Sequence, residues 1–102
     1  MSRESEMIRR LRILEWMKAE LAVCLGEVMR AVAGGVRAPM ARALARMIVS
    51  CYVLGRHLGI GYQDMDEEIG RCLETPLDGR MQEVEDRCGD YRALRRHCRS
   101  KE

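Results

Sequence analysis

The sequence predicts an all-α fold: an antiparallel helical bundle of four to five helices that associates into oligomers. Apolar residues recur at three- and four-residue steps along most of the chain, which is the period of a helix. Aromatic residues are scarce, with no Phe, whereas eight Met supply flexible aliphatic packing. Short breaks containing glycine or proline separate long helical segments, as in bundles of antiparallel neighbours. At 102 residues, the chain is expected to form a single α-helical domain over residues 1–102.

The first helix is predicted over residues 5–33. Ser2 and two glutamates supply a cap and acidic residues at its start, and Gly34 followed by Gly35 provides a stop that tolerates the left-handed conformation. Its apolar positions are Ile8, Leu11, Leu14, Met17, Leu21, Cys24, Leu25, Val28 and Val32.

The second helix is predicted between Pro39 and Leu58. Proline suits the first helical turn, where its missing N–H costs nothing, and Gly59 suits the end of the helix. Such a helix is about 30 Å long. Its wide apolar arc predicts a central helix with neighbours on at least two sides. The arc contains Met40, Leu44, Met47, Ile48, Cys51, Tyr52, Leu54 and Leu58.

The third helix is predicted from Tyr62 to Glu74, because Thr75 and Pro76 end it and acidic residues favour its N-terminal dipole. These acidic residues are Asp64, Asp66, Glu67 and Glu68. A short helical turn follows over residues 81–87. Asp90 then opens a final helix, which points Tyr91, Leu94 and Cys98 inward, and the last four residues fray.

Charge and cysteine content exclude several classes of protein. The net charge is +2 with mixed signs along the chain, so nucleic acid is an unlikely partner. Five cysteines without a C-x-x-C pair, and without a signal segment before them, predict reduced thiols that serve as small apolar residues. Because no apolar run reaches the length of about 20 residues that a bilayer requires, we expect a cytoplasmic protein without a membrane span.

The second helix is strongly apolar, yet it carries a row of arginines. Arg42, Arg46, Val49, Val53 and Arg56 align at steps of four, three, four and three residues. The sequence allows two interpretations of this stripe. It is a solvated face whose arginine stems cover apolar surface, or its two valines indicate that a partner subunit or another helix covers it.

The first helix carries a second polar row, formed by Glu20, Cys24 and Glu27. Two carboxylates on one helix are weak support for a metal site, because magnesium requires several carboxylates that converge from more than one helix. No glycine-rich phosphate loop or nucleophile with a neighbouring base is present, and His57 and His97 have no partners that sequence can supply. The residues by themselves show no active site.

Two stretches carry a resemblance to a known family, AELAVCLGEVMRAV at residues 19–32 and ARALARMIVSCYVLGRHLGIGYQDMDEEI at residues 41–69. They resemble MazG-type proteins, a group of all-α nucleoside triphosphate pyrophosphohydrolases. The opening IRRLRILEWMKAEL and the ending CGDYRAL are similar to the short, stand-alone MazG-like proteins of bacteria. The resemblance implies a helical fold that forms dimers or tetramers, with four acidic residues that hold magnesium and the triphosphate.

The resemblance implies four metal-ligand positions, which fall on Cys24, Glu27, Ala43 and Arg46. Only Glu27 retains an acidic side chain, and Arg46 has the opposite charge. A guanidinium group fixed a few ångström from the metal position repels a magnesium ion. We therefore expect Arg46, with Arg42 one turn away, to stand where active relatives hold the metal, paired with Glu27 and Glu20 across the helix pair.

The sequence leaves three functions open. The first is a catalytically degenerate MazG-like protein without a cofactor, a homodimer or homotetramer in which Arg42 and Arg46 can receive a nucleotide or another phosphate ligand. The second is a magnesium-dependent pyrophosphohydrolase that releases pyrophosphate and a nucleoside monophosphate. Its catalytic residues are Glu20 and Glu27, and its metal ligands are Glu20, Glu27, Asp64 and Glu67. The third is a nucleic-acid-binding protein that uses Arg92, Arg95, Arg96 and Arg99.

Overall fold

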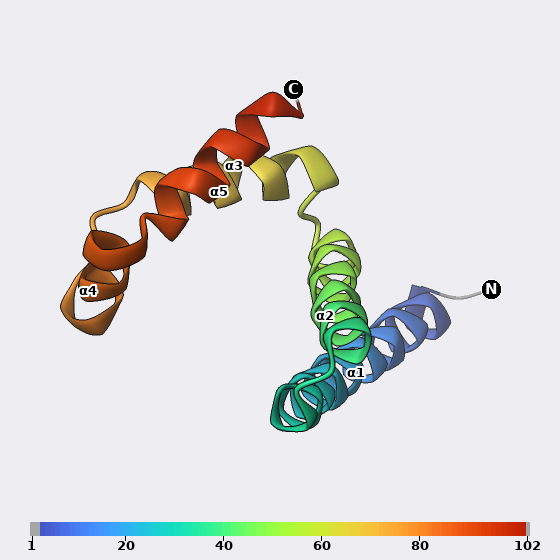
Figure 1. Cartoon of the computed structure of the whole chain (residues 1–102). Helices are drawn as coiled ribbons and strands as arrows, with labels where there is room; N and C mark the ends of the chain where they lie inside the picture. Colours follow the sequence, from blue (N-terminus) through green and yellow to red (C-terminus); the bar gives the residue numbers. More distant parts are fainter. Residues whose placement is uncertain (1–2, 102) are drawn as a thin grey trace. The chain divides into compact units, whose positions relative to one another are not determined.

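The computed structural model describes residues 3–101, which form helices joined by short connections (Figure 1). The helices are α1 (Arg3–Gly34), α2 (Arg37–His57), α3 (Tyr62–Glu74), α4 (Gly79–Cys88) and α5 (Asp90–Ser100). No strand occurs within residues 3–101, so the predicted all-α class is confirmed. The Ser2 cap expected for the first helix lies outside the described residues.

The chain divides into two compact units, Met1–Tyr62 and Gln63–Glu102. The first contains α1 and α2, and the second contains nearly all of α3 together with α4 and α5. The organisation of the chain as one functional domain stays a prediction.

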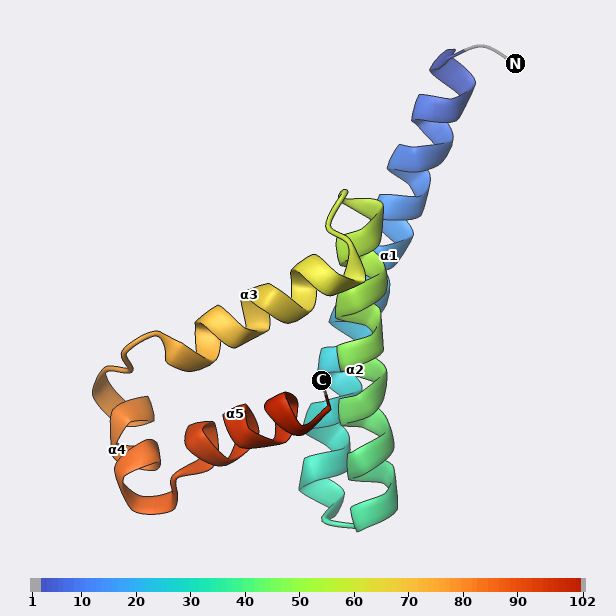
Figure 2. The ribbon, with the colours of Figure 1, turned by 90° about the horizontal axis from the view of Figure 1, so that it is seen from above.

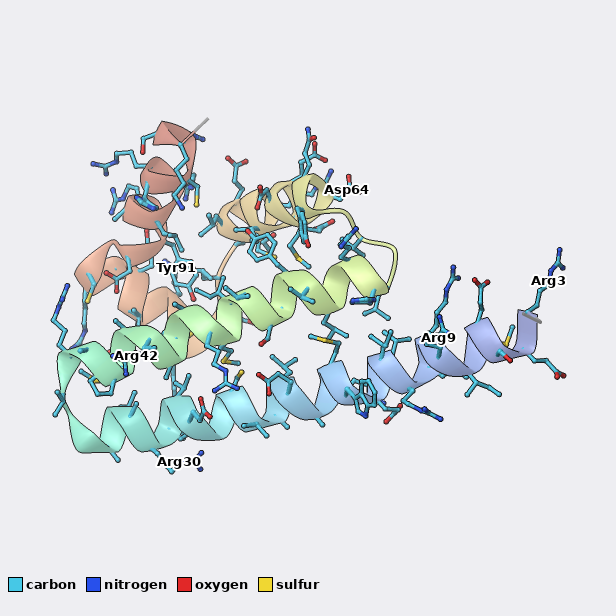
Figure 3. The ribbon with its side chains drawn as sticks, turned by 90° about the vertical axis from the view of Figure 1, so that its right-hand side faces the viewer. Arg3, Arg9, Arg30, Arg42, Asp64 and Tyr91 are labelled. Carbon is cyan, nitrogen blue, oxygen red and sulfur yellow. The ribbon has the colours of Figure 1, made fainter. Side chains whose placement is uncertain are left out.

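The first unit is an antiparallel helical hairpin, in which α2 runs back along α1 (Figures 2 and 3). Gly35 makes the turn at a φ of 71°, and its N–H donates to the carbonyl of Ala31 at 3.1 Å. The expected glycine stop is thus confirmed. The second helix begins two residues earlier than predicted, at Arg37, and Pro39 lies in its first turn as expected. Gly59, at a φ of 87°, follows its C-cap residue Leu58.

Small residues form the contact between α1 and α2. Cys24 is 0% exposed, and Ala43, Ser50 and Gly55 are buried on the facing helix. Small side chains permit a close approach of the two helix axes. In contrast, several large apolar side chains stay exposed, among them Leu25, Met29, Val32, Leu44, Ile48 and Leu58.

Two expectations about packing need correction within the described residues. We expected α2 to have neighbours on at least two sides, but within the first unit α1 is the one helix that packs against it. Cys51 was expected to pack inward, yet it is exposed. In both cases, helical periodicity correctly identified an apolar face, but a two-helix hairpin buries only the narrow strip between its helices.

The second unit begins with α3, whose predicted range Tyr62–Glu74 is confirmed. The next helix starts at Gly79 and ends at Cys88, so it is longer at both ends than the predicted turn over residues 81–87. Gly89 has a left-handed φ of 67° and separates α4 from α5. The last helix continues to Ser100, beyond the residue where fraying was expected to begin.

A carboxylate from α4 supports the start of α5. The N–H of Tyr91 donates to Oε1 of Glu85 at 2.8 Å. Asp90 is the first residue of α5, as predicted, whereas the N-cap residue is Gly89, which has no side chain to cap the helix. The amide at the helix start is therefore satisfied from the preceding helix.

Among the described residues, no single helix is both long enough and apolar enough to cross a membrane. Only α2 and α3 counted together, as two helices separated by a break, reach the required length and composition.

Candidate functional site

Arg46 on α2 joins two glutamates of α1. Its Nη1 donates to Oε1 and Oε2 of Glu27 at 3.0 and 2.9 Å, and its Nη2 donates to Oε2 of Glu20 at 2.8 Å. The pairing expected from the sequence is present. One guanidinium group thus binds two carboxylates that lie seven residues apart on the neighbouring helix.

Helical periodicity explains why these three side chains meet. Cys24 and Ala43 are buried where the two helices face each other. At about 100° per residue, Glu20 and Glu27 point about 40–60° to one side of Cys24, and Arg46 points about 60° to the corresponding side of Ala43. In an antiparallel pair these directions lie on the same side of the hairpin. Glu20 and Glu27 are seven residues apart, and Arg46 follows Ala43 by three residues. This spacing places the ion pairs along one edge of the contact between the two helices.

The cluster lies at the solvent boundary. The side chain of Arg46 is 47% exposed, and those of Glu20 and Glu27 are 37% and 33% exposed. The hydrogen bond and charge of Glu20, followed by the charge of Glu27, raise the pKa of Arg46 above its ordinary value. A guanidinium group matches carboxylates through paired hydrogen bonds, which makes such contacts stronger than those between neutral groups. Arg46 therefore remains a cation, and the three side chains together carry one negative charge.

Cys24 connects this cluster to the buried helix contact. Its Sγ lies 3.5 Å from Oγ of Ser50 and donates a long contact of 4.0 Å to Oε2 of Glu20. Thiols are weak hydrogen-bond donors, so this contact orients Glu20 only slightly. Sequence reasoning missed Ser50, although a small polar residue within the apolar run of the second helix was the available signal.

The residues of this site do not fit magnesium. Hard cations require several anionic oxygens around one point, and here the guanidinium group of Arg46 stands between the two carboxylates. Across residues 3–101, no three side chains of His, Cys, Asp or Glu are grouped as a metal site requires. Cys24 and Ala43, at two of the implied ligand positions, are buried and carry no oxygen.

The other predicted site residues are Arg42 in the first unit and Asp64 and Glu67 in the second. Arg42 is exposed one turn before Arg46. Asp64 is exposed in the first turn of α3, in the second unit (Figure 3). Glu67 follows it on the same helix and is also exposed. Their use as metal ligands together with the glutamates of α1 stays a prediction.

The other residues of the arginine stripe on α2 differ in their surroundings. Val49 is exposed, so no residue of the first unit covers that part of the stripe. Arg56 lies over the ring of Tyr62, with 5.9 Å between its Cζ and the ring centroid. A cation over an aromatic face is a favourable contact. The stripe therefore has three different environments within one helix: an ion-paired arginine, an exposed valine and a stacked arginine.

Comparison with known proteins agrees with the resemblance noted in the sequence. The model of the MazG-like family matches residues 7–90. No curated protein and no solved structure gives a significant match. The matched range contains the whole ion-paired cluster and extends over well more than half of the chain. The chain therefore belongs to the MazG-like family.

Proposed function

We propose that this protein is a catalytically degenerate relative of the nucleoside triphosphate pyrophosphohydrolases and acts as an oligomeric binding or regulatory module. Its family suggests the relation to these hydrolases. The observation that carries the proposal is the contact of Arg46 with both Glu20 and Glu27. A built-in cation takes the carboxylates that a divalent ion would need.

The chemistry of triphosphate hydrolysis explains why the pairing of Arg46 with the two carboxylates opposes catalysis. Metal ions neutralise the phosphate oxygens and activate the attacking water, so a site that cannot gather carboxylates around a metal lacks both contributions. Metal binding would also have to break the hydrogen bonds of Arg46 to Glu27 and Glu20. Because Arg46 is engaged in this way, Arg42 is the more accessible guanidinium group for a nucleotide or another phosphate ligand.

Support for self-association comes from the opposite side of the helix hairpin. Leu25, Met29 and Val32 of α1 point about 80–140° from Cys24, away from the ion pairs. Leu44, Ile48 and Cys51 of α2 point about 80–140° from Ala43, on that same side. Met29 is 66% exposed and Ile48 is 58% exposed. The hairpin thus has one apolar face, defined by these six residues, and one ion-paired face.

A second copy of the chain is the partner that we propose for this apolar face. Large contiguous apolar surfaces are rare on proteins that remain monomeric. A two-fold axis would place the apolar face of one copy on that of the other, and a stable pair of this kind buries about 800 Å² per partner. Homodimers and homotetramers both satisfy this requirement. We propose that these oligomers occur in the cytoplasm.

The test of the proposed function is an assay of pyrophosphate release. The purified protein is incubated with magnesium and each common nucleoside triphosphate. We expect no release above that of buffer, and the same result for Glu27→Gln. Release that depends on magnesium and disappears in Glu27→Gln would instead establish the hydrolase.

A further inference from the structure

The first turns of α1 extend beyond the helix hairpin. α1 has 32 residues and α2 has 21, so α1 is longer by 11 residues, which is about 16 Å of helix (Figures 2 and 3). Every residue from 3 to 12 is exposed, and we call this segment the N-terminal arm. Its apolar side chains include Met7, which is 62% exposed, and Leu11, which is 56% exposed.

The apolar face of the hairpin continues into this arm. Met7 lies 18 residues before Leu25, which is five helical turns, and Leu11 lies the same distance before Met29. Met7 and Leu11 therefore point about 100–140° from Cys24, in the same direction as the apolar face. One exposed apolar stripe thus runs along α1 from the arm to the hairpin, and such a stripe marks a site of association.

The stripe is symmetrical about Lys18. Leu11 and Leu25 are each seven residues from Lys18, and Met7 and Met29 are each eleven residues from it. We consider two copies of α1 that pack antiparallel, with a two-fold axis at Lys18. Leu11 of one copy then faces Leu25 of the other, and Met7 faces Met29 in the same way. Apolar side chains meet apolar side chains on both sides of the axis.

The charges at the centre of the stripe are compatible with this axis. Lys18 pairs with Glu15 at 2.9 Å, and their side chains are 62% and 69% exposed. A two-fold axis at Lys18 brings two such pairs together, so two cations and two carboxylates alternate there and balance one another. A single lysine within an apolar seam also fixes the register of paired helices.

The apolar face by itself is small for a stable pair. A fully exposed aliphatic side chain presents about 60–120 Å² of apolar surface. The six side chains of the apolar face are about half exposed, so they supply roughly 200–400 Å². A stable interface buries about 800 Å² per partner. The arm adds apolar surface that such an interface requires.

The arm reaches the part of the partner hairpin where two helices lie side by side. Leu44 and Ile48 flank Arg46 in sequence, and Arg46 contacts Glu27, so both lie alongside the part of α1 that contains Leu25. Antiparallel pairing brings the partner's arm to this level. Because no part of α2 lies beside the arm, the arm can lie across both helices of the hairpin. In a parallel pair, each arm would face the other arm instead.

We propose that the N-terminal arm of each copy lies on the apolar face of the other copy, in a reciprocal antiparallel dimer. This rests on the self-association in the proposed function, and it names the segment that covers the apolar face. Met7 and Leu11 of the arm provide the apolar contacts, and Lys18 lies at the two-fold axis.

Sedimentation of the full chain over a range of protein concentrations tests the arm. Leu11→Glu should weaken self-association at least about tenfold, because its carboxylate would be buried against Leu25 of the partner. Trp16→Glu is the matched control, since Trp16 is 63% exposed on the same helix but points about 140° away from Leu11. It should leave self-association within about twofold. Circular dichroism checks that each variant keeps its helices.

A double variant tests the antiparallel direction. Leu25→Lys alone should also weaken self-association at least about tenfold. When Leu11→Glu and Leu25→Lys are combined, an antiparallel dimer places a carboxylate opposite an ammonium group at two equivalent positions. The double variant should therefore associate at least about fivefold more tightly than either single variant. Parallel helices would place like charges opposite each other and give no such recovery.

Three results would overturn the arm while the oligomer of the proposed function stands. Leu11→Glu that associates as tightly as the unmodified protein would show that the arm lies outside the contact. Equal losses for Trp16→Glu and Leu11→Glu would show that the stripe is not the surface used. A double variant no tighter than the single variants would reject the antiparallel pairing.

The proposed oligomer fails by a different observation. An unmodified protein that stays monomeric at every concentration would reject self-association itself, and the arm contact with it. None of these measurements bears on pyrophosphate release.

Discussion

At the residue scale, the pKa of Arg46 sets the alkaline limit of the ion pairs. Hydrogen bonding and charge from Glu20, with the charge of Glu27, raise this pKa above its ordinary value. A group with a raised pKa in the folded state contributes stability below its pKa in the unfolded chain, as long as the carboxylates that raise the pKa are ionised. On the alkaline side, this contribution disappears only as the pH rises through the folded-state pKa.

A pH comparison tests this consequence. Arg46→Met should unfold at a lower urea concentration than the unmodified protein, because Glu20 and Glu27 lose their shared cation. The difference between the two midpoints should stay constant from about pH 7 to about pH 10, since an arginine does not titrate there. Circular dichroism at each pH gives the midpoints. A difference that shrinks steadily across this range would show that Arg46 is not the charge responsible.

Reversing the charge of the same residue tests its conflict with magnesium. Arg46→Asp places a third carboxylate beside Glu20 and Glu27, which repel one another without a cation. We expect magnesium to raise the melting temperature of this variant by about 4 °C or more, because binding to the folded state stabilises it. Thermal unfolding with and without the ion measures the effect.

Arg42→Asp is the control, since it makes the same charge change one turn away on α2. Its melting temperature should respond to magnesium as little as that of the unmodified protein. If Arg46→Asp does not fold, Arg46→Gln frees the same two carboxylates without adding a third, and its magnesium response replaces the test. An equal response of Arg42→Asp and Arg46→Asp would contradict a specific site.

At the element scale, the turn between α1 and α2 depends on one of two adjacent glycines. Gly35 has a φ of 71°, whereas Gly34 is the last residue of α1. Neither has an atom within 4 Å of the position that a Cβ would take, so space does not distinguish them. Backbone conformation does, because side chains disfavour a positive φ.

Two alanine substitutions separate these effects. Gly35→Ala should lower the free energy of unfolding by about 1 kcal/mol, the cost of a left-handed alanine. Gly34→Ala should raise it by about 0.5 kcal/mol, because alanine favours the helix. Urea unfolding measures both. Equal changes for the two variants would mean that the hairpin does not rely on the conformation of Gly35.

At the scale of the whole molecule, the two sides of the hairpin expose different side chains, and we propose that the apolar face binds a second copy. Ile48 and Val49 are adjacent and nearly equally exposed, at 58% and 60%. However, they point about 100° apart, so Ile48 belongs to the apolar face and Val49 to the arginine stripe. These two residues form a matched pair for locating the surface of self-association.

Ile48→Glu should weaken self-association at least about tenfold, because a carboxylate would be buried without a partner. Val49→Glu should leave it within about twofold. Sedimentation over a range of protein concentrations measures both. If Val49→Glu dissociates the oligomer and Ile48→Glu does not, the arginine stripe is the interface, as one interpretation of the sequence held.

Local sequence signals were enough to place most of the helices. The boundaries of α3 were predicted from its acidic start and from Pro76, which prevents continuation. The boundaries of α4 were not predicted correctly, because no apolar residue of the helical period marks its start at Gly79. The position of Arg46 among acidic ligand positions came from the family resemblance, because spacing within one helix cannot show what a second helix brings near.

The sequence by itself determined the helical class, the glycine turn and the two faces of each long helix, because these follow from backbone propensity and from periods of three and four residues. Only the tertiary structure decided that Arg46 binds both Glu20 and Glu27 and that Ser50 lies against Cys24. Such contacts join residues far apart in the chain. Their distances depend on how closely two helices approach, which only their packed side chains decide.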